Sequence, residues 1–295
     1  MGSLVALHDL AEKIFDCIYS FGNNLNIIDD FHIVTKKINK LLQLEEENKE
    51  NHLYDLNGKI IFSNVSIYIN NQIILKNINF IINQGENVAI IGKNGSGKSI
   101  LAKTILGFYK YDGNIYINNH NIKRLNKEDI RKSIELILGE SYMFSGTILE
   151  NIKLENNIKL AILEKTVTDC DIKDDIDGFK EGYNTLIGEK GTKLSGGQKQ
   201  RICIARSLIN NKPILILDEA MNKLDNKTRG NILSNLINNY NNRTIIFISN
   251  NLEIINYVDT IIYIDGKTTI TGTHDELLSK NKNYKRLIEI NKDVI

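Results

Sequence analysis

The stretch Gly92-Lys-Asn-Gly-Ser-Gly-Lys98-Ser99 decides the expected fold. It fits the phosphate-binding pattern G-x-x-x-x-G-K-[ST], whose glycines let the backbone approach an anion. The apolar run Val88–Ile91 before it suits a parallel strand buried on both faces, and Ile100–Phe108 after it suits a helix. Because strand, glycine-rich turn and helix are the setting that the pattern requires, we favour a phosphate site over a purely structural Gly/Ser/Lys turn.

The same pattern assigns roles to single residues. The N-terminus of the following helix would present unpaired N–H groups to phosphates. Lys98 would reach the β- and γ-phosphates of a nucleotide, and the Ser99 hydroxyl would ligate Mg²⁺. The loop residues expected to bind the nucleotide are Gly92, Lys93, Asn94, Gly95, Ser96, Gly97, Lys98 and Ser99.

Length and composition allow one large domain with an appendage, or two small domains. The chain has 295 residues, of which 42% are apolar, and its net charge of +1 gives no general attraction to nucleic acid. Its three cysteines (Cys17, Cys170, Cys203) are far apart, which indicates neither a disulfide framework nor a metal site and favours a reducing cytosol. The sequence has no long uncharged apolar run, so no membrane span is expected. Charges interrupt the apolar segment Leu4–Ile18, so no signal peptide is expected either.

The N-terminal segment is expected to be helical over residues 3–46. Apolar residues recur there at helical spacing, namely Ile14, Ile18, Phe21, Leu25, Ile28, Val34, Ile38, Leu41 and Leu42. The acidic and polar run Glu45–Asn51 is typical of a linker. We interpret the segment as resembling an amphipathic helix of the kind that docks on a partner.

Further along, the patterns predict an antiparallel layer followed by a helical region. Short β-branched runs with a turn at Asn70-Asn71 cover residues 60–62, 65–69, 73–75 and 78–82. Residues 113–210 are mostly helical in pattern, around a glycine-punctuated loop at 182–191. The helices expected there span residues 126–133, 147–151, 158–170 and 198–209.

Strands and helices alternate from residue 214 onward, which argues for a mostly parallel sheet covered on both faces. The apolar strand candidates are residues 214–217, 244–248 and 261–264, and the helix candidates are residues 227–240 and 275–290. Thr273-His-Asp-Glu276 fits a capping box for the last helix.

A second chemical motif is the strand Ile214–Leu217 followed by Asp218 and Glu219. An apolar strand that ends in two carboxylates places acid at the carboxyl edge of the sheet, where ligands bind in open α/β folds. Asp218 suits the Mg²⁺ shell, and Glu219 would polarise the water that attacks the γ-phosphate. Solvated acids at a strand end are the alternative, which the upstream phosphate loop disfavours.

A third motif, Leu194-Ser-Gly-Gly-Gln198, has two glycines at a helix start. With LSGGQ between the other two motifs, residues 56–292 resemble the nucleotide-binding domain of ATP-binding-cassette (ABC) transporters. The resemblance implies an α/β P-loop NTPase core with a mixed sheet, an antiparallel β layer and a helical subdomain at about 126–209. Residues 51–295 would form this domain, after a helical extension and linker at 1–50.

In that family two such domains pair head to tail, and the LSGGQ of one covers the ATP of the other. The resemblance therefore implies that Ser195, Gly196, Gly197 and Gln198 serve the ATP of a partner domain, in a homodimer or a heterodimer. It also implies that Asp225 lies in the loop that couples the two sites. ATP and Mg²⁺ are the implied cofactors.

Four segments resemble exporters rather than importers, namely residues 20–47, 144–148, 188–191 and 272–277. Residues 20–47 are similar to the cytosolic end of an exporter's last membrane helix and its linker. The closest similarity is to bacterial peptide or bacteriocin exporters. A transporter membrane domain is then an expected partner, nucleic acid is not, and the expected location is cytoplasmic, at the inner face of the cell membrane.

Three positions depart from the family pattern. Gly139 stands where the family has a Gln that contacts Mg²⁺ and water, with Glu140 adjacent. Asn250 stands where the family has its switch His, and an amide donates a neutral hydrogen bond but carries no positive charge. Ile69 stands where an aromatic residue stacks on adenine, and Tyr68, one residue away, would face the other side unless a bulge at Asn70-Asn71 turned it.

These observations predict a chain that binds Mg-ATP and hydrolyses it slowly, with Glu219 and Asn250 as the catalytic residues. The main alternative is a largely non-hydrolysing subunit that completes the ATP site of a partner. A third possibility, a non-transport family member that acts on DNA or ribosomes, is disfavoured because no long insertion or second cassette is present.

Overall fold

The computed structural model describes residues 2–43, 54–154 and 156–290. The chain divides into two compact units, residues 1–48 and 49–295. The run Glu45–Asn51, predicted to be a linker, lies outside the described residues.

The first unit is a single helix, α1 (Gly2–Leu42), close to the predicted span of residues 3–46. Its apolar side chains are exposed on more than one side, because sequence neighbours such as Ile14 and Phe15 are both exposed. The apolar surface is therefore wider than the single stripe predicted. Within the described ranges no helix, α1 included, combines the length and the apolar character that crossing a bilayer requires.

The second unit contains the predicted antiparallel layer, a four-stranded sheet in the order β2-β1-β4-β5. Its strands are β1 (Ile60–Ile69), β2 (Gln72–Ile82), β4 (Tyr111–Ile117) and β5 (His120–Asn121). Asn70 and Asn71, both with positive φ, form the predicted turn. The two short runs predicted at residues 60–62 and 65–69 belong to one strand, β1. A register irregularity between Phe62 and Val65 accommodates Asn64, and β1 pairs with β2 on both sides of it. The strand at Tyr111–Ile117 corrects the prediction that helices begin soon after residue 113.

The central sheet has six strands in the order β10-β9-β3-β8-β7-β6. They are β3 (Asn87–Gly92), β6 (Ile134–Leu138), β7 (Ile214–Asp218), β8 (Thr244–Ile248), β9 (Thr260–Asp265) and β10 (Thr268–Gly272). All pairs are parallel except β9 with β10, so the sheet is mixed, as predicted. Leu138 pairs with Asp218 and Asp218 pairs with Ile248. The loops after β6, β7 and β8 therefore leave the sheet side by side.

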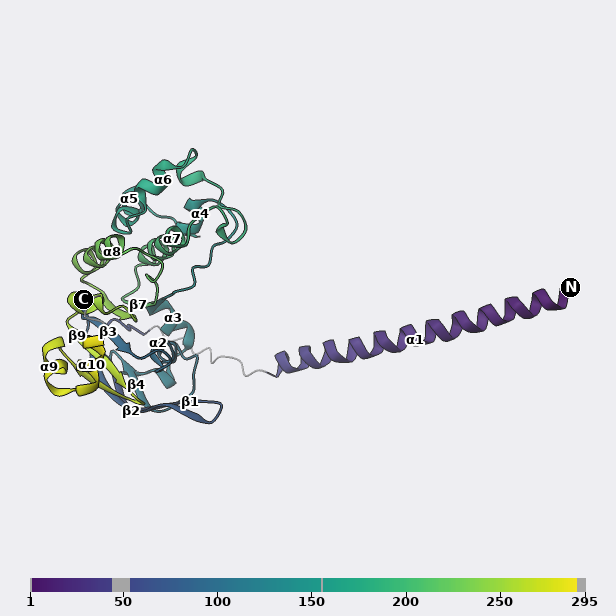
Figure 1. The fold of residues 1–295 in the computed structure, drawn as a ribbon, viewed down its shortest axis with the longest axis horizontal. Coiled ribbons are helices and arrows are strands. Elements are labelled where there is room, and N and C mark those ends of the chain that lie inside the picture. Colours follow the sequence, from purple (N-terminus) through teal and green to yellow (C-terminus); the bar gives the residue numbers. More distant parts are fainter. Residues whose placement is uncertain (1, 44–53, 155, 291–295) are drawn as a thin grey trace. The chain divides into compact units, whose positions relative to one another are not determined.

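Helices form much of the remaining sequence, and Figure 1 shows α4 to α8 gathered together on one side of the strands. Their bounds are α2 (Lys98–Ile105), α3 (Lys127–Ser133), α4 (Ile148–Lys153), α5 (Leu160–Asp169), α6 (Lys173–Gly178), α7 (Gly196–Ile209), α8 (Asn226–Asn239), α9 (His274–Lys280) and α10 (Lys282–Ile290). The helix predicted over residues 275–290 is two helices. Asn281 has an extended backbone, and its side chain accepts a hydrogen bond from Tyr284 N (2.7 Å) that starts α10.

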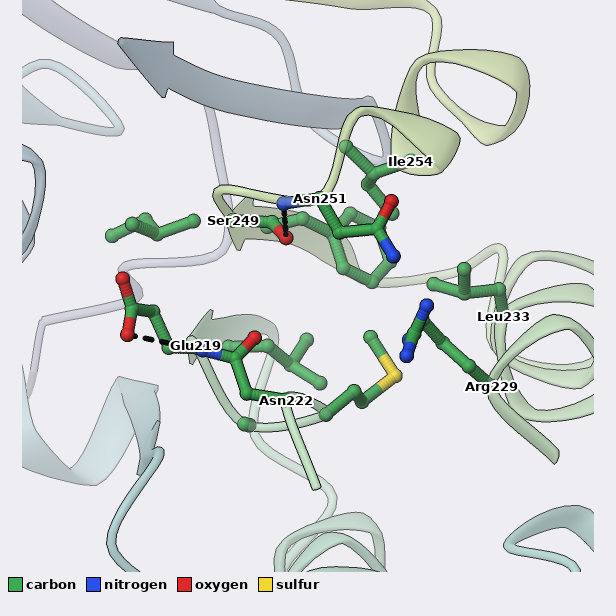
Figure 2. Close-up of a pocket in the computed structure, with 12 residues that line it drawn as sticks. Glu219, Asn222, Arg229, Leu233, Ser249, Asn251 and Ile254 are labelled. Atoms are coloured by element: carbon green, nitrogen blue, oxygen red, sulfur yellow. Dashed lines mark hydrogen bonds between the residues drawn. The ribbon is translucent and has the colours of Figure 1, made fainter. Parts of the chain in front are cut away.

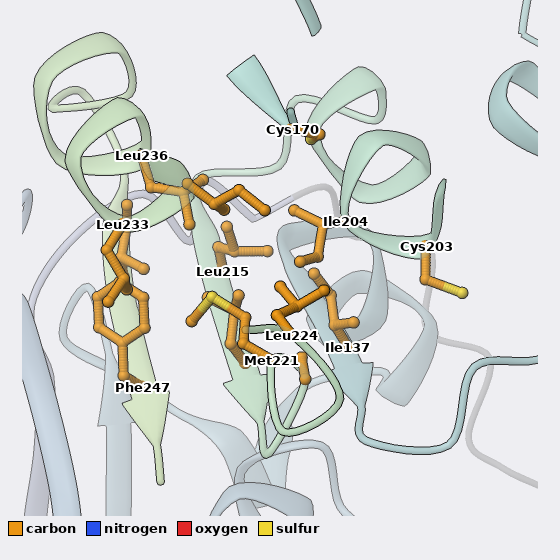
Figure 3. Packing of buried hydrophobic residues seen from close by; sticks show 14 of the residues in the cluster. Ile137, Cys170, Cys203, Ile204, Leu215, Met221, Leu224, Leu233, Leu236 and Phe247 are labelled. Carbon is orange, nitrogen blue, oxygen red and sulfur yellow. The ribbon is translucent and has the colours of Figure 1, made fainter. Parts of the chain in front are cut away.

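Alternate residues of the central strands face two separate cores. Ile216 and Ile246 pack toward the antiparallel sheet and α2. Leu215 and Phe247 face the helical side, where Figure 3 shows them beside Leu233 of α8. Because both faces are buried, the strands are continuously apolar, which is the pattern that made them recognisable.

Candidate nucleotide-binding and hydrolysis site

The phosphate loop (residues 92–99) joins β3 to α2 at the carboxyl edge of the central sheet. Gly97, with φ 100°, is the residue that precedes α2, so a side chain there would strain the backbone. Lys98 is buried, and its Nζ donates to the backbone oxygens of Gly92 (2.9 Å) and Lys93 (3.1 Å). Burial lowers the pKa of Lys98, and the nearby carboxylates Glu219 and Asp218 oppose that shift.

The predicted metal residues contact each other directly. The Ser99 hydroxyl donates to Asp218 Oδ1 at 2.7 Å, which joins the start of α2 to the end of β7. Burial raises the pKa of Asp218, and the hydrogen bond from Ser99 opposes the rise. A hydroxyl and a carboxylate are hard oxygen donors of the kind that Mg²⁺ prefers alongside substrate phosphates. No group of three or more His, Cys, Asp or Glu side chains in the described residues is placed to hold a metal by itself.

Glu219, the next residue, lies between two asparagine amides. Asn250 Nδ2 donates to Glu219 Oε1 at 2.6 Å, and Asn222 Nδ2 donates to Oε2 at 3.1 Å. Figure 2 shows Glu219 at the end of β7 with Asn222 directed back toward its carboxylate. The backbone of Glu219 has φ 54°, a strained value for a residue with a side chain, and its N–H donates to Ile248 O (2.9 Å).

Gly139 follows β6 and lies against Glu219. A Cβ built on Gly139 would come within 3.0 Å of the backbone oxygen of Glu219 and 3.3 Å of its Cβ. The neighbouring Gln200, buried in α7, donates to Gly139 O (3.2 Å) and accepts from Lys223 N (2.8 Å). This one amide therefore links α7 to the segments that follow β6 and β7.

Two adjoining cavities open on these residues. One, of about 340 Å³, is lined by Asn94–Ile100 of the loop and helix together with Glu219 and Asn250. The other, of about 500 Å³, is lined by Ser99, Lys103, Leu138, Gly139, Glu140, Gln200, Asp218, Glu219, Asn222 and Lys223. Together they bring the phosphate loop, the acidic pair and two of the three departing positions, Gly139 and Asn250, around one space.

The structure places Tyr68 elsewhere. Tyr68 lines a separate cavity of about 580 Å³ with Tyr111 and Asp112, and neither Tyr68 nor the half-buried Ile69 lines the two cavities at the phosphate loop. A hydrogen bond to the Asp112 carboxylate raises the pKa of Tyr68. One of the register irregularities of β1 falls between Ile67 and Tyr68, and Tyr68 still lines the separate cavity. The assignment of Tyr68 and Ile69 to the nucleotide stays a prediction.

Replacing Tyr68 with alanine is expected to leave the affinity for ATP unchanged, because the ring faces a different cavity. A fluorescent ATP analogue titrated against the purified chain measures this, with Tyr116→Ala as a matched tyrosine control. A clear loss of affinity for the Tyr68 variant alone would support the predicted assignment of Tyr68 to the nucleotide site.

The LSGGQ residues begin α7 and contact their own chain. The Ser195 hydroxyl accepts from Gln198 N (3.1 Å), and Gln198 Oε1 accepts from Ser195 N (2.9 Å), which is a capping box. Gln198 also donates to Asp175 Oδ1 (2.6 Å) on α6. Residues 195–198 line neither cavity at the phosphate loop, so their role toward the ATP of a partner stays a prediction.

Sequence reasoning missed two polar residues at this site, Asn222 and Gln200. Asn222 follows Glu219 by three residues in a tight turn, where such a spacing brings side chains together. Gln200 carried a weaker signal, because a buried polar residue in a helix is recognised only once its partners are known.

Known proteins match this chain over the region that contains the phosphate loop and the acidic pair. A family model described as "ABC transporter" matches residues 75–222, half of the chain. The chain is 35% identical to the ABC transporter ATM1 of Plasmodium falciparum over 91% of the chain and 29% of that protein. It is 34% identical to the leukotoxin export ATP-binding protein LtxB of Aggregatibacter actinomycetemcomitans (99% of the chain, 43% of the relative). It is also 34% identical to the pediocin PA-1 transport/processing ATP-binding protein PedD of Pediococcus acidilactici (87% and 37%).

A solved structure, "Structure of a bacterial Atm1-family ABC exporter with ATP bound", superimposes with a TM-score of 0.82 at 31% identity. The alignment covers 90% of this chain and 48% of that one. The chain spans less than half the length of the curated relatives named above. The family model covers the phosphate loop and the acidic pair, and the fold is shared with an exporter. The chain therefore belongs to the ABC transporter family as a nucleotide-binding domain of the exporter type.

Proposed function

We propose that this chain binds Mg-ATP at its phosphate loop and hydrolyses it slowly to drive export through a membrane domain. The observation that carries the proposal is the contact between Ser99 and Asp218 beside Glu219. These three residues line the cavities that residues of the phosphate loop also line. Oxygen ligands, a buried lysine and a carboxylate base thus meet at one sheet edge, which is what phosphoryl transfer to water requires.

Each of these residues has its own task. Lys98, held by two backbone carbonyls, presents a positive charge at the loop and balances the charge of the β- and γ-phosphates. Glu219 accepts a proton from the attacking water and orients it. Ser99 and Asp218 would hold Mg²⁺, which neutralises charge on the phosphates during transfer.

Slow hydrolysis follows from two of the three departing positions, Asn250 and Gly139. Asn250 donates a neutral hydrogen bond to Glu219 and brings no positive charge. Gly139 has no side chain to orient water or metal. Losing one preorganised contact of this kind costs about 3–4 kcal/mol, or roughly two to three orders of magnitude in rate.

The partners of the proposal are a second nucleotide-binding domain and a transporter membrane domain. Residues 195–198 would cover the ATP bound to the second domain, which fits their place at the N-terminus of α7. The exposed apolar helix α1 would continue from the membrane domain, and the catalytic unit would lie on the cytoplasmic side of the cell membrane. LtxB is named for leukotoxin export and PedD for pediocin PA-1 transport, and we extend this to a peptide cargo for the present chain.

The Glu219→Gln variant tests the enzymatic part. Phosphate release by the purified chain is expected to fall by about a hundredfold or more relative to the unmodified chain, because the amide does not accept the proton. ATP affinity, measured separately, should stay the same. Equal rates for the two proteins would contradict hydrolysis by this chain.

A second candidate function is favoured by the contact of Gly139 with the Glu219 backbone. Here the chain binds ATP without significant turnover and supplies its LSGGQ to a partner whose site is complete. Mixing the chain with such a partner would raise the partner's ATPase rate, and Ser195→Ala in this chain would abolish the gain. In the first candidate, Glu219→Gln in this chain lowers the combined rate, whereas in the second it does not.

A further inference from the structure

We propose that Asn94 is a site of spontaneous deamidation that inactivates the empty phosphate loop, and that bound nucleotide protects it. Asn94-Gly95 is one of two Asn-Gly pairs in the chain, the other being Asn57-Gly58. Asn-Gly pairs are chemically labile because glycine has no side chain to hinder attack by its own backbone nitrogen. The two pairs share this chemistry and differ in their surroundings.

The surroundings of Asn94 leave the reaction open. Asn94 and Gly95 are both exposed, at the corner of a turn closed by Ser96 N donating to Lys93 O (3.1 Å). No neighbouring heavy atom lies within 4 Å of the Cβ position of Gly95. Within the part of the chain that the structure describes, the Asn94 amide has no hydrogen-bond partner. Nothing therefore holds the side chain away from the backbone nitrogen.

Asn57 is restrained by comparison. Its Oδ1 accepts from Gln84 Nε2 (3.2 Å), and its backbone N–H donates to Asp55 Oδ1 (2.9 Å). Gly58 is buried, and a Cβ there would lie 2.5 Å from Asn118 Oδ1. The Asn57 side chain has to leave its contact with Gln84 before the ring can close, so this pair should react more slowly and serves as an internal control.

The reaction needs only water. The Gly95 backbone nitrogen forms a bond to Asn94 Cγ, the bond from Cγ to Nδ2 breaks, and ammonia leaves with the former amide proton of Gly95. Water then opens the resulting succinimide at either carbonyl. The products are an aspartate at position 94 and its isomer, in which the chain continues through the side-chain carboxyl carbon and one methylene is added to the backbone.

Either product changes the phosphate site. Asn94 lines the cavity of about 340 Å³ with Lys98 and Ser99, so a carboxylate formed there faces the space that phosphates occupy. A negative charge near a polyphosphate repels it, and we expect ATP affinity to fall by at least about tenfold. The isomer additionally displaces the Gly95 N–H from the cradle of backbone donors.

Protection by nucleotide rests on the proposed function, because it needs ATP to bind this loop. Phosphate oxygens that accept from the loop N–H groups would hold the Gly95 nitrogen in place and occupy the space beside Asn94. Asn94 should therefore deamidate in the nucleotide-free loop and not in the loop that holds nucleotide.

The test incubates the purified full chain at 37 °C and pH 8 without nucleotide. Peptide mass spectrometry follows the mass gain of about 1 Da at Asn94 and at Asn57, and isoaspartate methylation reports the isomer. We expect several-fold faster conversion at Asn94, and none in Asn94→Gln, whose longer side chain closes the ring poorly. An intact Asn94 in the native chain, when the urea-denatured chain reacts at both pairs, would overturn the proposal.

Two further arms separate this inference from the proposed function. Asn94→Asp should bind a fluorescent ATP analogue at least about tenfold more weakly than Asn94→Gln; equal affinity would overturn the functional consequence. In the unmodified chain, saturating Mg-ATP should slow conversion at Asn94 and leave Asn57 unaffected. Conversion at an unchanged rate in a chain shown to bind ATP would overturn protection, whereas failure to bind ATP at all would overturn the proposed function and leave the deamidation result standing.

Discussion

The Asn250→His variant is expected to hydrolyse ATP about a hundredfold faster than the unmodified chain. Asn250 Nδ2 lies 2.6 Å from Glu219 Oε1 and lines the phosphate-loop cavity, so a ring nitrogen placed there reaches the same carboxylate. Histidine also carries a positive charge when protonated, which stabilises charge on the γ-phosphate in the transition state. Steady-state phosphate release measures the gain.

The gain should depend on pH with a definite sign. A histidine side chain has an unperturbed pKa of about 6.5, so its charged form is more abundant at lower pH. The rate advantage of Asn250→His over the unmodified chain should therefore grow between pH 8 and pH 6. Asn241→His, in the exposed loop between α8 and β8, is the matched control and should show no gain. An Asn250→His rate equal to that of the unmodified chain, with ATP binding retained, would contradict a limiting role for Asn250.

Lys98→Ala is expected to lose at least about tenfold to a hundredfold in ATP affinity, because a charge-assisted hydrogen bond to a phosphate is worth about 1.5–3 kcal/mol. The variant also removes the bonds from Nζ to the Gly92 and Lys93 carbonyls, which fix the loop. Isothermal titration with ATP measures the affinity, and thermal unfolding of the nucleotide-free protein separates a binding defect from a folding defect.

Lys110→Ala provides the control for Lys98→Ala, since it removes an exposed lysine just after α2. It should bind ATP as the unmodified chain does. A Lys98→Ala protein that unfolds normally and binds ATP with unchanged affinity would contradict the phosphate-binding role of the loop.

The parts of the fold predicted from sequence are those with an uninterrupted pattern. β3, β7 and β8 are buried on both faces, so their apolar runs were unbroken and their strand character was plain. Ser99 and Asp218, which the sequence assigns to the same Mg²⁺, lie in contact because each belongs to a motif with a fixed place relative to a strand end, and their role toward the metal stays a prediction. Local chemistry and topology agree at these positions.

The elements missed are those whose local pattern conflicts with their tertiary setting. β4 begins Tyr-Asp-Gly-Asn, so only Ile115 and Ile117 show the buried alternation of a strand. The last helix breaks at Asn281, whose side chain also donates to Asp265 Oδ2 (3.2 Å), a contact that the sequence does not reveal. In the site, the direction of Tyr68 depended on the register of β1, which a one-residue shift reverses.

The close approach of Gly139 to Glu219 also limits which residues position 139 can hold. A side chain added at residue 139 would place its Cβ 3.0 Å from the Glu219 backbone oxygen, a tight contact that requires the oxygen to shift slightly. A side chain introduced at residue 139 alone therefore requires the turn that holds Glu219 to adjust. Gly139 and that turn behave as one structural unit, so the two segments have to be redesigned together.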